Sequence, residues 1–316
     1  MTVTPALHIV SGKGGTGKST VATSLAIALA EAGQRVLLAE TEGRASLATL
    51  LGIERLTYDE HRIHGPWNGE LWAQSIEPSP ALVDYVRSFF PIPGAAAILQ
   101  RSGATTFVTA LAPGLKDVLI TGKFCEAARR KRGNSYAFDA VVVDAPPTGR
   151  VHQFLNVTAA VLRVSPPGNV RAHAERIAEV IQADSTRVHL VVNDDDAAVQ
   201  EAIEAVVALR TLGIGVGSLV CNRRAAAWPT MPEPPKLTQL LTHAGSDGSA
   251  AALTQQLIMM SHDAQADAEA TNEWNSQLQD TGAAITTLPE VMAATVADLP
   301  LRLAKVLDTK TFAGIS

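Results

Sequence analysis

The stretch from Gly12 to Ser19 reads GKGGTGKS and fits the pattern G-x-x-x-x-G-K-[ST]. It follows a short apolar run and opens a helical stretch, the context in which this pattern forms a phosphate-binding loop. Glycines let backbone N–H groups turn inward around phosphate oxygens, and the helix that begins there adds its dipole. The pattern predicts a nucleotide-phosphate site built from Gly12, Gly14, Gly15, Thr16, Gly17, Lys18, Ser19 and Thr20.

Two side chains of this loop have predicted chemical roles. We expect Lys18 to reach the β- and γ-phosphates of a bound nucleotide, and the Ser19 hydroxyl to bind Mg²⁺. The alternative is a chance glycine turn, which the length and the context of the match disfavour.

The rest of the chain alternates between short β-rich runs and longer helical patterns. Several runs are apolar throughout, as expected when helices cover both faces of a parallel sheet. The alternation predicts a doubly wound, mostly parallel α/β sheet of about seven strands. The expected strands cover 6–10, 35–39, 70–76, 138–143, 187–192, 216–221 and 283–288, and the expected helices include 18–32, 148–159, 169–183, 197–212, 249–280 and 295–307.

The length of 316 residues and the absence of an internal repeat predict a single domain over residues 1–316. Two stretches interrupt its alternation. Residues 78–131 are expected to form a mostly helical insert, and the proline-rich residues 223–235 are expected to form a loop.

Composition limits the function classes. The net charge of −5 argues against a nucleic-acid partner held by phosphate contacts. Cys125 and Cys221 lie far apart and suit a reducing compartment. The first apolar run is too short for a signal peptide, and prolines and glycines interrupt the least charged window, 89–115. We therefore expect a cytoplasmic protein without a transmembrane segment.

Lys13 is a second lysine in the phosphate loop. With it, the motif resembles the deviant Walker A motif, GKGGxGK[ST], of a family that includes partition ATPases, the nitrogenase iron protein and the arsenical-pump ATPase. The resemblance implies that Lys13 reaches across a dimer interface to the nucleotide of the partner. A cation there would stabilise charge on the transferred phosphoryl group. The alternative is a solvated loop lysine.

The second expected strand ends in LLAETEGRASLATLLG, where the resemblance implies a switch with an Asp that orients the attacking water. Glu42 falls on that position, and Gly43 and Arg44 replace the Pro-Ala of the arsenical-pump branch. A glutamate can do the same work, although its extra methylene displaces the carboxylate. Glu40 either binds a magnesium water or ends the strand. Arg44 either contacts phosphate or pairs with a neighbouring acid.

The fourth expected strand ends in FDAVVVDAPPTGRVHQFL, which resembles the second switch of the arsenical-pump and guided-entry ATPases, D-x-x-P-T-G-x-x-x-x-F-L. The resemblance implies that Asp144 holds Mg²⁺ through water and that Thr148 and Gly149 sense the γ-phosphate. Arg150 stands where those relatives have His, so the role of that His does not transfer.

The resemblance covers most of residues 7–222 and is closest to single-domain actinobacterial proteins labelled anion-transporting ATPases. It implies ATP and Mg²⁺ as ligands, and recognition of adenine by Asn222 at the end of the sixth expected strand. With only Cys125 and Cys221, the chain offers no cysteine cluster for arsenite or zinc.

Three functions remain open at this stage. The first is an ATP-hydrolysing switch that works as a homo-dimer, or as a hetero-dimer with a paralogous ATPase, and couples the nucleotide to an unknown client. The second is a weak or inactive nucleotide-binding regulatory subunit, which the altered segment Glu42-Gly43-Arg44 favours. The third is a partition-type ATPase on DNA or membrane, for which the tail DTKTFAGIS offers neither a basic surface nor an amphipathic helix.

Three further segments have alternative interpretations. The apolar side chains of the insert either pack on the core and a partner subunit, which we favour, or line an exposed client groove; they are Phe89, Phe90, Ile92, Ile98, Leu99, Phe107 and Leu111. The basic run 128–132 is either a solvated helix end, which we favour, or a contact for nucleic acid or anionic lipid. The acidic residues 194–196 are expected to cap a helix that starts near Ala197.

Overall fold

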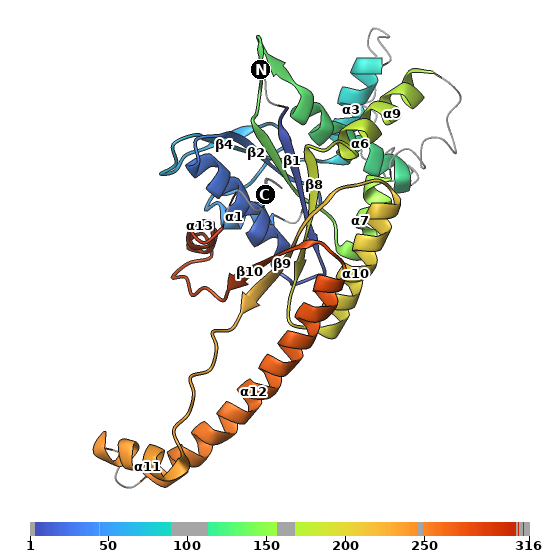
Figure 1. The fold of residues 1–316 in the computed structure, drawn as a ribbon. Helices are drawn as coiled ribbons and strands as arrows, with labels where there is room; N and C mark the ends of the chain where they lie inside the picture. Colours follow the sequence, from blue (N-terminus) through green and yellow to red (C-terminus); the bar gives the residue numbers. More distant parts are fainter. Residues whose placement is uncertain are drawn as a thin grey trace.

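The computed structural model describes residues 4–43, 45–89, 113–156, 168–245, 249–307, 309 and 312. Its centre is an eight-stranded sheet with the order β10-β9-β8-β1-β7-β2-β4-β3 (Figure 1). All seven expected strands are present, and they pair in parallel. They are β1 (Ala6–Gly12), β2 (Arg35–Glu40), β4 (Glu70–Ser75), β7 (Ala140–Asp144), β8 (Thr186–Val192), β9 (Val216–Arg224) and β10 (Ala284–Pro289).

The eighth strand was not expected from the sequence. β3 (His61–Ile63) pairs antiparallel with β4 at one edge of the sheet. It has three residues, and two of them are exposed, so the sequence shows almost no hydrophobic periodicity there. A separate hairpin of β5 (Lys131–Arg132) and β6 (Ser135–Tyr136) follows the insert. The basic run 128–132 is therefore a helix end only as far as Arg129, and its last two residues form a strand.

The side chains of each central strand point alternately to the two faces of the sheet and pack in two hydrophobic cores, one on each face. Leu7 and Ile9 of β1 belong to the core that α6, α7, α9 and α10 cover. Val10 belongs to the other core, which α1 and α13 cover (Figure 1). The helices are α1 (Lys18–Glu31), α2 (Ser46–Leu50), α3 (Pro78–Phe89), α6 (Pro113–Arg129), α7 (Thr148–Leu155), α9 (Asn169–Ile181), α10 (Asp196–Thr211), α11 (Pro234–His243), α12 (Ala250–Asp280) and α13 (Asp298–Ala304).

The insert is helical at both of its described ends, in α3 and α6. Phe124 and other buried side chains of α6 belong to the main core. Residues 90–112 lie outside the described residues. The side chain of Phe89 does as well, so the structure does not test the apolar residues on which the client-groove alternative rests.

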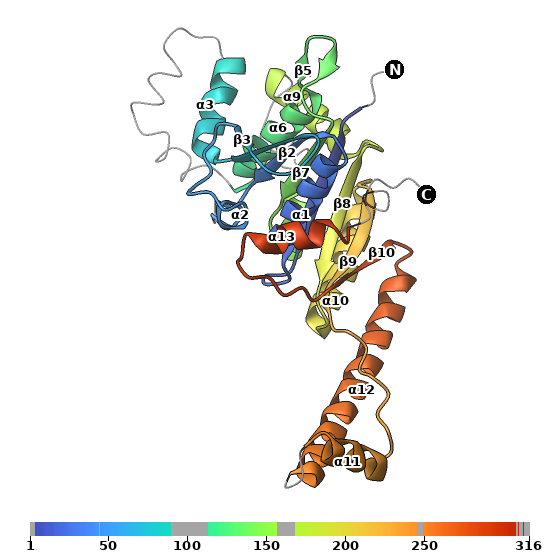
Figure 2. The ribbon, with the colours of Figure 1, turned by 90° about the vertical axis from the view of Figure 1, so that its left-hand side faces the viewer.

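α12 extends away from the sheet, and α11 lies at its far end (Figure 2). The proline-rich segment is a loop only in its middle, because β9 continues to Arg224 and α11 begins at Pro234. Of the helices in the described part of the chain, none combines the length and the apolar character needed to cross a membrane.

Two histidines form a polar pair inside this apolar sheet. Nδ1 of His8 on β1 lies 3.1 Å from Nε2 of His189 on β8. Since the N–H of Ser218 donates to Nδ1 of His189, the proton of His189 lies on Nε2 and is donated to His8. Burial, followed by nearby Arg187, lowers the pKa of His8 to about 4, and burial lowers that of His189 as well. Both rings are therefore neutral at pH 7.

Candidate functional site

The predicted phosphate loop joins β1 to α1. Gly15 and Gly17 have φ angles of 86° and 91°, in the left-handed region that glycine adopts without strain. A Cβ on Gly12 would lie 2.5 Å from Oγ1 of Thr16, so this position has no room for a side chain. Gly14 and Gly15 are exposed. The loop therefore presents backbone at its rim, as a phosphate cradle requires.

Three expected residues meet at the start of α1. Ser19 Oγ donates a 2.6 Å hydrogen bond to Oδ2 of Asp144 at the end of β7. Lys18 is buried beside them, and Thr20 is half-buried one residue further along α1. Because β1 and β7 are parallel neighbours, their carboxyl ends bring the loop and Asp144 together at one edge of the sheet.

The carboxyl group of Asp144 is almost completely buried, and its Oδ1 has no hydrogen-bond partner among the described residues. Burial raises the pKa of Asp144 to about 6; the Ser19 hydrogen bond and Lys18 oppose that rise, whereas Glu40 and Glu42 add to it. Glu40 and Glu42 therefore lie close enough to Asp144 to repel its negative charge, and Lys18 lies close enough to attract it. Burying like charges close together is costly, and a positive charge beside Asp144 lowers that cost.

The first expected switch lies against the same loop. Oε2 of Glu42 lies 3.4 Å from Nζ of Lys18. Glu40 ends β2 and is buried, with its Oε1 3.4 Å from the hydroxyl of Ser46. The hydroxyl of Thr41 donates to the backbone oxygen of Asp144, which ties this segment to the end of β7. Arg44, for which we had two alternatives, lies outside the described residues.

The second expected switch is held by a residue that the sequence did not suggest. The hydroxyl of Thr148 and the N–H of Gly149 both donate to Oε1 of Glu201 on α10, over 2.6 and 2.8 Å. Glu201 lies more than fifty residues along the chain from both, so no local motif links them. Arg150 makes a 3.5 Å ion pair with Asp117 on α6, which connects the insert to α7.

Lys13 points to a neighbour within its own chain. Its Nζ lies 3.4 Å from Oδ1 of Asp195, and the side chains of this pair are 36% and 51% exposed. The same Asp195 oxygen accepts a hydrogen bond from the N–H of Ala198 and caps α10, as expected for the acidic residues 194–196. Lys13 is therefore half-buried, and its ion pair is of the surface kind that contributes little stability.

Asn222 lies at the end of β9 and contacts the back of the phosphate loop. Its Nδ2 donates a 2.8 Å hydrogen bond to the backbone oxygen of Thr16. A Cβ on Gly17 would lie 2.5 Å from the same nitrogen. Asn222 is 4% exposed, so in this conformation it supports the loop, and adenine recognition remains a prediction.

Within the described ranges, no three or more His, Cys, Asp or Glu side chains are arranged to hold a metal ion by themselves. Cys125 on α6 and Cys221 on β9 are both buried and free.

Comparisons with known proteins agree with this geometry. The sequence profile of the family described as anion-transporting ATPase matches residues 6–165. ATPase BagA of Mycobacterium tuberculosis is 41% identical over 223 residues, which cover 70% of this chain and 66% of that protein. ATPase GET3 of Kluyveromyces lactis is 30% identical over 165 residues, covering 49% of this chain and 46% of that protein.

A further similarity extends to the septum site-determining protein MinD of Helicobacter pylori. It is 27% identical over 198 residues, covering 58% of this chain and 65% of that protein. In all three comparisons the match spans no more than 66% of the length of the relative.

Proposed function

The chain belongs to the anion-transporting ATPase family, and we propose that it is an ATP-hydrolysing molecular switch that acts as a dimer. One observation carries the proposal: Ser19 of the phosphate loop is hydrogen-bonded to Asp144, next to Lys18 and Glu42. These are the side-chain types that phosphoryl transfer needs at one place, namely a hydroxyl and a carboxylate for Mg²⁺, a lysine for phosphate and a second carboxylate for water.

The residues present fit ATP and Mg²⁺. Asp144 carries a buried oxygen without a protein partner, and Ser19 offers its hydroxyl beside it. We propose that Ser19 and Asp144 hold the ion, Asp144 through water, and that Gly12 to Thr20 hold the phosphates. The ion would supply neutralisation of charge on the phosphate oxygens.

The pair of Lys18 and Glu42 suggests how nucleotide binding changes the site. The two groups lie 3.4 Å apart, and each is mostly buried. A phosphate that binds Lys18 offers that lysine a stronger anionic partner and releases Glu42 from it. We propose that the released carboxylate then orients the attacking water and accepts its proton.

The dimer is proposed from Lys13. Its partner Asp195 is exposed, so the cost of leaving it is small. We propose that Lys13 moves to the nucleotide of the other subunit when two molecules close face to face. Whether that subunit is a second copy or a paralogue is open, and the client and the cytoplasmic location remain predictions.

The test is Mg²⁺-dependent ATP turnover by the isolated protein, together with calorimetric titration of ATP. We expect Lys18→Ala to abolish measurable ATP binding, because the phosphates lose their main point charge. Lys236→Ala is the matched control, since Lys236 is an exposed lysine on α11. Unchanged ATP affinity in Lys18→Ala would overturn the assignment of the loop.

Glu42→Gln separates hydrolysis from binding. We expect ATP affinity close to that of the wild type and a loss of turnover of about 10²-fold or more, typical of removing a general base. A wild-type protein that binds ATP but shows no turnover, alone or mixed with Glu42→Gln, would support the second candidate, a regulatory subunit of a hetero-dimer. The altered switch segment that begins at Glu42 favours that candidate.

A further inference from the structure

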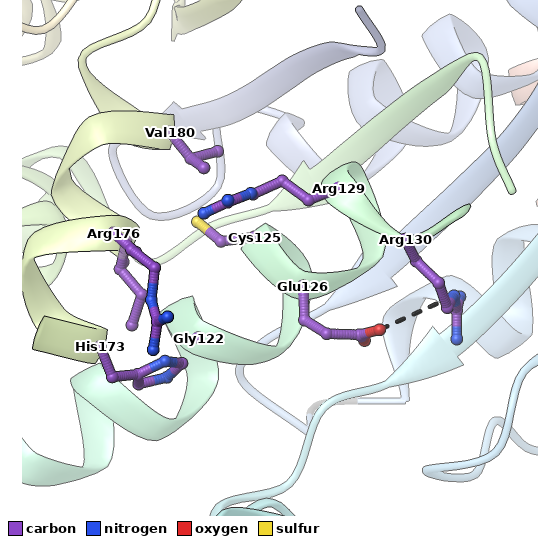
Figure 3. Close-up of a pocket in the computed structure, with 9 residues that line it drawn as sticks. Gly122, Cys125, Glu126, Arg129, Arg130, His173, Arg176 and Val180 are labelled. Atoms are coloured by element: carbon purple, nitrogen blue, oxygen red, sulfur yellow. Dashed lines mark ion pairs between the residues drawn. The ribbon is translucent and has the colours of Figure 1, made fainter. Parts of the chain in front are cut away.

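A cavity of about 300 Å³ lies between α6 and α9, and none of its lining residues belongs to the phosphate loop or the switches (Figure 3). Arg129 reaches from the end of α6 toward α9, and Arg176 lies alongside His173 on α9 (Figure 3). Two helices distant in sequence thus direct cationic side chains into one hollow. The volume is at the small end of the range for ligand pockets in proteins.

The positive charge of this cavity is not neutralised by its own wall. The one acid in the lining, Glu126, pairs with Arg130, which also pairs with Glu60. Arg129 and Arg176 form no ion pair with any described residue. Both guanidinium groups are exposed, and in the described part of the chain no carboxylate pairs with either, so solvent or a ligand can balance their charges.

The remaining wall is small and uncharged. Gly122 leaves the space open, because a Cβ at this position would lie 3.2 Å from Nε2 of His173. Burial, and then Arg176 and Arg129, lower the pKa of His173 to about 4, so its ring is neutral at pH 7. Burial raises the pKa of the Cys125 thiol, which is also uncharged. The imidazole and the thiol therefore add no negative charge to the wall beside the two arginines.

We propose that this cavity is a binding site for a phosphate dianion, held between Arg129 of α6 and Arg176 of α9. Guanidinium groups bind phosphate through paired N–H donors, and two of them on different helices can grip one group from both sides. The size of the cavity suits inorganic phosphate or a small phosphate monoester. A bound dianion would join α9 to the insert helix α6, which Asp117 connects to Arg150 at the start of α7.

Because we propose that the phosphate loop also binds phosphate, the test uses the Lys18→Ala variant of the whole 316-residue chain as its background. Inorganic phosphate and glycerol 3-phosphate are titrated separately by calorimetry, and thermal melting is followed with each. We expect one phosphate bound per chain and a rise in Tm. Tighter binding of glycerol 3-phosphate would identify a monoester as the ligand; equal or tighter binding of inorganic phosphate would identify the free ion.

Two variants and one control decide the outcome. Arg129→Gln with Arg176→Gln should weaken phosphate binding at least tenfold and remove the rise in Tm. Gly122→Val should block the cavity. It should weaken phosphate binding and remove the rise in Tm to the same extent, although every charge is kept. Lys131→Gln with Arg132→Gln removes two exposed cations of the β5–β6 hairpin and should change binding less than twofold. Equal binding by both double variants, or no binding to the Lys18→Ala protein, would overturn the proposal while leaving the ATPase proposal untouched.

Discussion

The hydroxyl of Thr148 and the backbone N–H of Gly149 share one acceptor, Oε1 of Glu201, at 2.6 and 2.8 Å. These are the two donors that the family resemblance assigns to sensing the γ-phosphate. In this conformation a carboxylate of α10 therefore occupies the donors that a phosphate oxygen would need. We therefore expect nucleotide binding at this switch to compete with Glu201.

We predict that Glu201→Ala raises the affinity for a non-hydrolysable ATP analogue and leaves that for ADP unchanged. The wild-type protein must break two charge-assisted hydrogen bonds to free the switch, whereas the variant need not. We expect a gain of roughly three- to tenfold, since a ligand shifts such an equilibrium only by its preference for one state. Calorimetric titration with both nucleotides measures it.

Glu204→Ala is the control for this prediction, because Glu204 lies on the same helix and bonds only to Gln200 among the described residues. The melting temperature of Glu201→Ala should fall slightly, since α7 loses an anionic partner at its first turn. Equal weakening of ATP and ADP binding would contradict the prediction and make Glu201 a support for α7 alone.

A second prediction concerns Lys13, whose amine is held by Asp195 at 3.4 Å. Lys13→Ala should leave ADP binding nearly intact, because the amine pairs with Asp195 in this conformation. It should lower ATP turnover, and mixing with Glu42→Gln should restore part of the activity if subunits exchange. Turnover of single and mixed variants is the measurement.

Loss of ADP binding in Lys13→Ala would instead make this lysine an ordinary residue of the loop. Asp195→Asn is a useful comparison, since it weakens the ion pair and keeps an N-cap acceptor for Ala198. If Lys13 acts on a partner, Asp195→Asn should not lower turnover.

Much of the fold followed from the sequence, because parallel strands covered on both faces are apolar throughout and helices between them are long. β3 and the β5–β6 hairpin were missed because runs of two or three residues carry no measurable period. The expected loop 223–235 included the first two residues of α11. Pro234 and Pro235 occupy the first turn of that helix, where proline is tolerated.

The candidate site, too, could be predicted from the sequence only in part. Lys18, Ser19 and Asp144 could be found because each lies in a local motif beside a strand end. The role of Glu201 could not, since α10 reaches α7 only through tertiary packing. Nor could the contact of Asn222 with Gly17, which depends on the position of β9 relative to the loop.

A third prediction uses the buried pair of His8 and His189. The unfolded chain takes up protons on these rings below pH 6.5, whereas the folded protein does not do so at His8 until pH falls to about 4. The stabilisation from a neutral His8 is therefore complete above pH 6.5 and is lost as pH falls from 6.5 toward 4. The limiting slope is about 1.4 kcal/mol per pH unit for one histidine.

We predict that His8→Leu lowers the free energy of unfolding at pH 7 but makes its fall between pH 6.5 and 4.5 shallower. The raised pKa of Asp144 acts on both proteins equally, so the difference in slope reports the pair of His8 and His189, whose pKa His8 also lowers. Urea denaturation at several pH values measures it. His64→Leu, at an exposed position, should keep the slope of the wild-type protein, and identical slopes for His8→Leu and the wild type would contradict the prediction.

The last prediction tests whether the insert is part of the core. Phe124 of α6 is completely buried, and its ring centroid lies 6.2 Å from that of Phe154 on α7. Phe124→Ala should cost about 3–5 kcal/mol of unfolding free energy, because the cavity it leaves lies between two packed helices. Val207→Ala, at a position 62% exposed, should change stability by less than about 0.5 kcal/mol. Urea denaturation followed by circular dichroism measures both. A Phe124→Ala protein as stable as the wild type would show that α6 can leave the core. The apolar face of the insert would then be free for a client, and the client-carrier alternative would move ahead of a closed switch.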